Sequence, residues 1–225
     1  MPIINTTLYG RKIEMSVKEP FRHERSIVAI DPDGAKSAAA YIVRGEILGF
    51  EMLDLFKLML RAEEWCRTGQ LVLLEYVDND KPTFNKKGDK GAAVKNSIAQ
   101  KVGRVKQAAR QIEQVLERAG CEYLLIEPLR IPEKQHAKKQ KMGDTFFNDL
   151  TGWHGATNAD KRDAAVIGLY GLPDNYNVCE RKHVFTGNRC PSCARADAAK
   201  ARRSAKAKAA AQTRKMKAAA KGARV

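Results

Sequence analysis

Three short runs of apolar residues constrain the fold of this chain more than any other feature. They lie in the segments Ser26–Asp31, Leu71–Val77 and Tyr123–Ile126, and the last is followed directly by Glu127. The runs are continuously apolar instead of alternating with polar residues, which indicates β-strands buried on both faces. Strands of this kind need helices on both sides of their sheet.

The remaining segments supply those helices and two more strands. Leu53–Thr68 carries Leu53, Phe56, Leu60 and Cys66 at the spacing of one helix face, and apolar residues recur every three or four positions from Val94 to Ala119. Residues 135–150 and Asp160–Tyr170 are also expected to be helical, the second capped by Asn158. Further strands are predicted at Ala38–Val43 and Glu46–Glu51. This order of elements predicts an α/β domain.

Acidic residues stand where such a domain binds its ligands, beyond the carboxyl ends of its strands. Asp31 and Glu75 both come late in their strands, and burying Glu75 is costly unless it is paired or binds a metal. Asp160 and Asp163 share one helix face because they are three residues apart. Oxygen ligands without His or Cys favour Mg²⁺ or Mn²⁺.

Each acid also has a plainer interpretation. Asp31 could be a residue of an Asp-Pro-Asp-Gly turn, Glu75 could form an ion pair, and Asp163 could pair with Arg162 or Lys161. If all three interpretations held, two strand ends and a helix face would have come together by accident. The sequence therefore favours a metal site.

The segments VAIDPDG, LVLLEYV and ADKRDAAVIGL resemble the RuvC-like Holliday junction resolvases of the RNase H-like nuclease superfamily. The long helix after Glu75 is also similar, and the resemblance extends over about Ser26 to Leu172. The family has a glycine directly after its Asp-Pro, whereas this chain has Asp33 there, with Gly34 one place later. Asp33 is thus a rival ligand to Asp31.

The resemblance implies a mixed five-stranded sheet flanked by helices. It also implies metal-assisted hydrolysis of DNA phosphodiesters, with two Mg²⁺ or Mn²⁺ ions held by a tetrad of acids. The tetrad consists of Asp31, Glu75, Asp160 and Asp163. The resemblance further implies a homodimer that nicks opposed strands of a four-way junction. The alternatives are a flap or fork DNA nuclease with the same chemistry, or a non-catalytic DNA- or RNA-binding protein.

Basic and aromatic residues border the expected site. In the resembled family a lysine contacts the scissile phosphate, and Lys138 matches it best, the alternative being a solvated helix face. Members of that family also use an aromatic residue to wedge open base pairs at the crossover. In this chain Phe84 is the first candidate for that role and Tyr76 the second. The residues expected to bind DNA are Phe84, Lys86, Lys87, Lys134 and Lys139.

The segment CERKHVFTGNRCPSC offers four soft ligands for one structural Zn²⁺ ion: Cys179, His183, Cys190 and Cys193. A knuckle this small, within residues 173–194, has no hydrophobic core and should be unfolded without metal. The alternatives are three scattered thiols, or a redox pair of Cys190 and Cys193. Cys66 and Cys121 are expected to be core residues.

The charge of the chain is concentrated at its C-terminus. Of a formal net charge of +15, residues 194–225 hold eleven Lys or Arg and one Asp, a net +10. The tail, residues 195–225, is expected to be disordered alone and to become helical on a phosphate backbone, tethering the protein to nucleic acid. Residues 1–25 form an N-terminal extension with a possible hairpin, and residues 26–172 the nuclease domain.

The sequence also bears on where the protein works. It has no apolar run of about 18 residues, the length of a membrane span, and no hydrophobic signal core near Met1. Five cysteines, three of them crowded near the C-terminus, do not suggest a secreted disulfide framework. We expect a protein of the bacterial or phage-infected cytoplasm, and the small zinc site with a basic tail suggests that a phage or mobile element encodes it.

Overall fold

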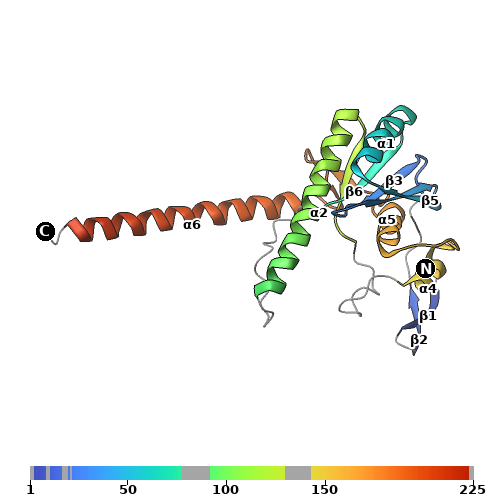
Figure 1. The fold of residues 1–225 in the computed structure, drawn as a ribbon, viewed down its shortest axis with the longest axis horizontal. Coiled ribbons are helices and arrows are strands. Elements are labelled where there is room, and N and C mark those ends of the chain that lie inside the picture. The colour runs from blue at the N-terminus through green and yellow to red at the C-terminus, as the bar shows by residue number, and fades with distance from the viewer. Residues whose placement is uncertain are drawn as a thin grey trace.

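The computed structural model describes residues 3–8, 11–16, 20, 22–77, 92–129 and 143–222. At its centre is a five-stranded sheet in the order β5-β4-β3-β6-β7 (Figure 1). Its strands are β3 (Ile27–Asp31), β4 (Ser37–Val43), β5 (Glu46–Leu53), β6 (Leu71–Glu75) and β7 (Tyr123–Ile126). β4 runs antiparallel to both β3 and β5, whereas β3, β6 and β7 are parallel. This mixed five-stranded sheet with flanking helices is the arrangement that the family resemblance implied.

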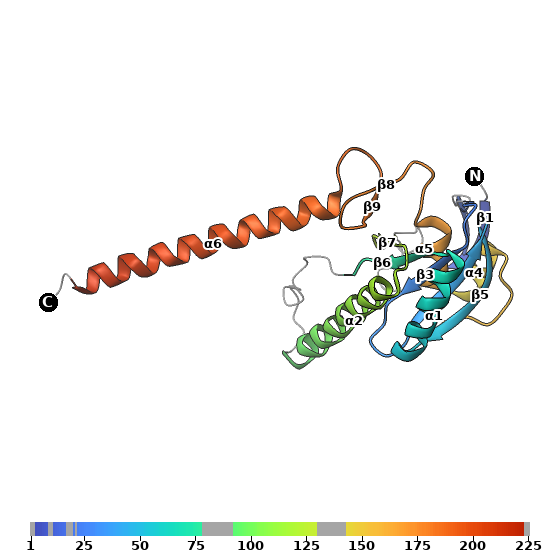
Figure 2. The same cartoon turned by 90° about the horizontal axis from the view of Figure 1, so that it is seen from above.

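Helices cover both faces of the sheet, as the apolar runs predicted (Figures 1 and 2). One face packs against α1 (Leu55–Thr68) and α2 (Ala92–Ala119), and the other against α5 (Ala159–Tyr170) with α4 (Asp144–Thr151) beside it. Successive side chains of a strand point to opposite faces. In β3, therefore, Val28 and Ile30 join the α1 and α2 core, whereas Ile27 and Ala29 join the α5 core.

The buried face of α1 differs from the predicted one. Asp54 caps the helix by accepting a hydrogen bond of 2.9 Å from the Lys57 backbone N–H. The side chains that reach the core are Leu58, Ala62 and Trp65. Phe56, Leu60 and Cys66, which the spacing placed on one face, are all exposed. The prediction that Cys66 is a core residue is thus wrong, whereas Cys121 is buried and its thiol donates to the Ala62 carbonyl.

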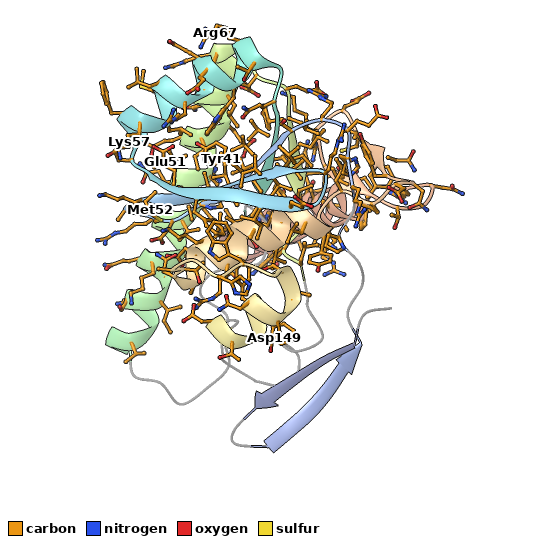
Figure 3. The ribbon with its side chains drawn as sticks, turned by 90° about the vertical axis from the view of Figure 1, so that its right-hand side faces the viewer. Tyr41, Glu51, Met52, Lys57, Arg67 and Asp149 are labelled. Carbon is orange, nitrogen blue, oxygen red and sulfur yellow. The ribbon has the colours of Figure 1, made fainter. Side chains whose placement is uncertain are left out.

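Polar side chains tie α1 to the edge strand β5, in the region labelled in Figure 3. Glu51 points to the α1 side, where it accepts hydrogen bonds of 2.9 Å from the Tyr41 hydroxyl and from Arg61 Nε. Burial raises the pKa of Tyr41 above its ordinary value, and the hydrogen bond to Glu51 and the charge of Glu51 raise it further. The next residue, Met52, packs against the opposite core, as strand alternation requires.

Helix α5 lies unusually close to the sheet because it carries a glycine at the point of contact. A Cβ at Gly168 would lie 1.9 Å from Ile42 Cδ1 and 3.0 Å from Ala29 Cβ. Real Cβ atoms are not found at the shorter distance, so a side chain here must push the helix or the strands aside. The placement of α5 over β3 and β4 therefore depends on Gly168.

Replacing Gly168 by alanine should lower the free energy of unfolding by about 1–3 kcal/mol, because extra volume in a packed core forces neighbouring groups to move. Urea unfolding measures this. The matched control is Gly103→Ala in α2, where a Cβ meets nothing within 4 Å. That change should stabilise the protein by about 0.5–1 kcal/mol, since alanine favours helix. Equal stability of the two variants would contradict the close approach.

The remaining elements lie outside the central sheet. β1 (Ile3–Leu8) and β2 (Arg11–Ser16) pair antiparallel, in the segment where a hairpin was predicted. β8 (Asn177–Val178) and β9 (Val184–Phe185) form a second antiparallel pair, and α6 (Pro191–Gly222) follows. α6 projects from the domain as one long helix (Figure 2), where the sequence predicted a tail that is disordered until it binds a phosphate backbone. None of the helices described is long and apolar enough to span a membrane.

Candidate active site and metal centre

Asp31 and Glu75 are the last residues of two neighbouring parallel strands. Ile30 in β3 is paired with Leu74 in β6, so the two acids follow side by side at the carboxyl edge of the sheet. Strand alternation turns both toward the face covered by α5, since Ala29 and Leu73 point there as well. The edge predicted to bind ligands thus carries both acids on one face.

Asp160 and Asp163 are brought to the same place by α5. Asn158 caps this helix, its side chain accepting a hydrogen bond of 2.9 Å from the Lys161 backbone N–H. The helix therefore begins just before Asp160. Its buried face, which includes Ala164 and Ala165, packs against the sheet.

The charges of the other three acids all act on Asp31. Burial raises its pKa from 3.8 to about 9, with further increases from a hydrogen bond to Glu75 and from the charges of Glu75, Asp163 and Asp160. A half-buried carboxyl among three other acids is a place where positive charge would be strongly stabilised. The donor set, carboxylate oxygens alone, is the one that Mg²⁺ and Mn²⁺ prefer.

The structure also bears on the alternatives. Asp33 is exposed in the turn after β3, where its backbone N–H donates to Ser37 Oγ at 3.3 Å, and it is not among the groups that raise the pKa of Asp31. Arg162, offered by the sequence as a partner for Asp163, is buried and pairs with Asp144 of α4. It also donates to Thr157 Oγ1 at 3.0 Å. Arg162 therefore ties the start of α5 to α4.

Several predicted site residues lie outside the described residues. They are the candidate phosphate contact and the five residues expected to bind DNA: Lys138, and Phe84, Lys86, Lys87, Lys134 and Lys139. The second candidate for the wedge, Tyr76, is described. Its ring lies 4.4 Å from that of His183, between centroids.

The C-terminal cysteines and histidine form a compact cluster. All four potential ligand atoms lie within 4.8 Å of one another. His183 Nδ1 is 3.4, 3.6 and 3.5 Å from the sulfurs of Cys179, Cys190 and Cys193, and Cys179 Sγ is 3.6 Å from Cys193 Sγ. A tetrahedral Zn²⁺ site with ordinary bond lengths places such atoms about 3.5–3.8 Å apart. The cluster therefore fits structural zinc.

The ionisation of the cluster also suits a metal. Burial lowers the pKa of His183, and the charge of Arg181 lowers it further, which keeps the imidazole neutral and able to bind a cation. Burial raises the pKa of Cys193 to about 12, together with hydrogen bonds to Cys179 and Cys190. Without a cation the Cys193 thiol therefore holds its proton, whereas hydrogen bonds from the backbone of His183 and from Cys193 lower the pKa of Cys179. A divalent ion would displace the proton of Cys193.

The knuckle is held to the central sheet at two places, and the sequence predicted neither of them. The first place is Leu125 of β7. The Leu125 backbone N–H donates to the Lys182 carbonyl at 2.7 Å, and Leu125 forms a parallel bridge with His183. The knuckle thus extends the sheet beyond β7.

The second contact joins Glu127 to the first turns of α6. Its carboxylate accepts hydrogen bonds from Ser192 Oγ and from the guanidinium of Arg195. The sequence held one signal for this role, because Glu127 follows an apolar strand just as Glu75 ends one. Its partners, more than sixty residues away, could not be read from that signal.

Comparisons with known proteins add little at the level of sequence. No protein-family model matches the chain, and no curated protein does. Among solved structures, the chain is similar to T. thermophilus RuvC in complex with Holliday junction substrate. The sequences are 14% identical, the TM-score is 0.40, and the match covers 64% of this chain and 90% of that one.

Proposed function

We propose that this protein is a divalent-metal-dependent endonuclease that hydrolyses phosphodiester bonds in branched DNA, with four-way junctions as its substrate. One observation carries the proposal. Asp31 lies half-buried at the carboxyl edge of the sheet, where Glu75, Asp163 and Asp160 all raise its pKa. A protein that only bound nucleic acid would gain nothing from acids gathered in this way, because they repel phosphates.

The residues that would hold the metal are the four acids, with Asp31 at their centre: Asp31, Glu75, Asp160 and Asp163. A pair of Mg²⁺ or Mn²⁺ ions held there would supply Lewis-acid chemistry, the activation of a water and the stabilisation of the leaving oxygen of a phosphodiester. The charge of the acids suits two dications, since four carboxylates balance four positive charges.

The protein's own part in this chemistry is to hold the acids in place. Asp31 and Glu75 are fixed by the hydrogen-bonded register of β3 and β6. The start of α5 is fixed by the Asn158 cap and by the pairing of Arg162 with Asp144. A site built on strands and a capped helix is ordered before substrate arrives, which reduces the cost of organising the transition state.

Other parts of the proposal rest on the family resemblance alone. We propose that Lys138 contacts the scissile phosphate, and that Phe84 separates base pairs at the crossover. Two copies of the chain would act together, each nicking one of two opposed strands. Lysines flanking these positions would bind the arms of the junction: Lys86, Lys87, Lys134 and Lys139.

Cleavage of labelled DNA by the parent and by a Glu75→Gln variant tests the proposal. The substrates are a four-way junction, a flap, a Y-fork and a linear duplex, each with Mg²⁺ or with no divalent metal. We expect symmetric nicks in the junction that require Mg²⁺ and that the variant loses by a factor of about 10³ or more, because one ligand of the metals has lost its charge.

Binding separates the remaining outcomes. The variant should bind the junction at least as tightly as the parent, since it removes negative charge and leaves the basic surface intact. Cleavage of flaps or forks but not junctions would replace the proposed substrate with those structures. Binding of junctions without cleavage in the presence of Mg²⁺ would show a non-catalytic protein and overturn the proposal.

A further inference from the structure

The root of α6 lies at the same edge of the sheet as the candidate active site. Glu75, the last residue of β6, is paired with Ile126 of β7, and Glu127 follows Ile126 directly. Glu127 holds Ser192 and Arg195 in the first turns of α6. The long basic helix therefore starts one strand away from Glu75.

The metal cluster fixes the same end of the helix. α6 begins at Pro191, between the ligands Cys190 and Cys193, and Cys193 lies in its first turn. Proline at the first position of a helix is favoured because its φ is already helical. A bound metal and Glu127 would thus hold the first turn from two sides, while the rest of α6 projects from the domain (Figures 1 and 2). At 1.5 Å per residue its 32 residues span about 48 Å.

The charges of α6 are not evenly spread around its axis. At 100° per residue, Arg195, Arg202 and Lys206 fall within about 40° of one another. Lys200 and Lys208 fall within about 40° of the opposite direction, on either side of the one acid of the helix, Asp197. Side chains from residue 197 to residue 213 are mostly exposed. Arg195 is paired with Glu127, so the face that continues from it through Arg202 and Lys206 is called the basic face below.

We propose that α6 is a directed DNA-binding arm: the metal cluster and Glu127 fix its root beside the candidate active site, so that its basic face binds the phosphates of a duplex arm of the substrate. This rests on the proposed function, which makes DNA the partner. It replaces the flexible tether that the sequence predicted with a helix of defined direction.

The composition of α6 favours nucleic acid over a lipid surface. From Ala194 to Gly222 the only large apolar residue is Met216. A helix that lies in a membrane interface needs a broad apolar face to bury. Arginine and lysine separated by alanines offer charge for phosphate contacts and nothing to insert.

Two matched double variants test whether direction matters beyond charge. Arg202→Gln with Lys206→Gln removes two charges from the basic face, and Lys200→Gln with Lys208→Gln removes two from the opposite side. Binding to a labelled duplex is measured by fluorescence anisotropy with neither Mg²⁺ nor chelator, so that cleavage plays no part. We expect the first pair to weaken binding about tenfold or more and to lower the salt slope by about 2, and the second to weaken it less than about twofold.

A Glu127→Ala variant tests whether the anchored direction of α6 or its charge alone governs DNA binding, because the two explanations predict opposite changes in affinity. If charge alone governed binding, removing this acid would strengthen it. We expect it to weaken binding at least about threefold and to reduce the difference between the two double variants, while metal analysis still finds the zinc. Circular dichroism confirms that each variant remains folded.

Three results would overturn the proposal: equal losses from the two double variants, tighter binding by Glu127→Ala, or binding to vesicles of anionic phosphatidylglycerol as strong as to DNA. None of them depends on nuclease activity. A protein that lacks cleavage but keeps the difference between the two faces would retain the arm and lose only the proposed chemistry.

Discussion

Replacing Asp31 by asparagine should abolish the proposed DNA cleavage, by a factor of about 10³ or more, and at the same time make the metal-free protein more stable. Both effects follow from one feature, the placement of this carboxyl among three others. Cleavage is lost because asparagine cannot supply the charge that holds two dications. Stability rises because a half-buried charge without a cation is costly.

The sign of the stability effect follows from the direction of the pKa shift. The pKa of Asp31 is raised from 3.8 to about 9, so without metal the folded protein holds this proton more tightly than the unfolded chain. Its contribution to stability is present below pH 3.8 and is lost as the pH rises toward 9. Between these values the parent should lose stability relative to Asp31→Asn. Near pH 8 we expect the variant to be more stable by at least about 1 kcal/mol, or about 2–4 °C in Tm.

Asp33→Asn is the matched control, because it makes the same change two residues away, at an exposed carboxyl. It should change neither cleavage nor metal-free stability appreciably. Thermal melts with added Mg²⁺ complete the test, since Mg²⁺ should stabilise the parent and Asp33→Asn but not Asp31→Asn. If Mg²⁺ stabilises all three proteins equally, Asp31 is not a metal ligand.

Cys190→Ser should lose the structural zinc and unfold the knuckle. The knuckle contains two short paired strands and Cys190 among its buried residues, which is too little apolar surface to fold by itself. In small zinc domains the metal supplies about 10–16 kcal/mol of apparent binding free energy, which serves as folding free energy. We expect zinc to fall from one equivalent to near zero, and limited proteolysis to cut within residues 173–194.

Cys66→Ser is the control for this variant, because Cys66 is an exposed thiol outside the cluster. It should keep one zinc and resist proteolysis as the parent does. The central sheet should survive in both variants, since the knuckle supplies only Val184 and the partly buried Tyr176 to its two cores. A parent protein that contains no zinc, or a Cys190–Cys193 disulfide found by mass spectrometry, would contradict the zinc assignment.

Much of the central fold could be predicted because the relevant signals are local. A continuously apolar strand must be covered on both faces wherever it lies, so β3, β6 and β7 were recognisable from their composition. Boundaries were less exact. β5 extends to Leu53, where the sequence predicted the start of a helix, because Asp54 caps α1 and delays its first turn.

The prediction chose the wrong buried face of α1, and the reason is physical. Its apolar residues occupy more than one side of the helix, so spacing alone allows several buried faces. Packing on the sheet selects Leu58, Ala62 and Trp65, while Phe56 and Leu60 remain exposed. Only the position of α1 relative to β5, held by Glu51 and Arg61, decides between them.

By itself, the sequence determined which chemistry is available: oxygen ligands at two strand ends and one helix face, and soft ligands at a spacing that suits zinc. These are properties of residue type and of short-range periodicity, which do not depend on the rest of the fold. Only the tertiary structure decided which of these groups meet. The register of β3 with β6 set Asp31 beside Glu75, and Glu127 joined a distant helix to the same edge. Such contacts depend on packing between segments far apart in the chain, and no local pattern encodes them.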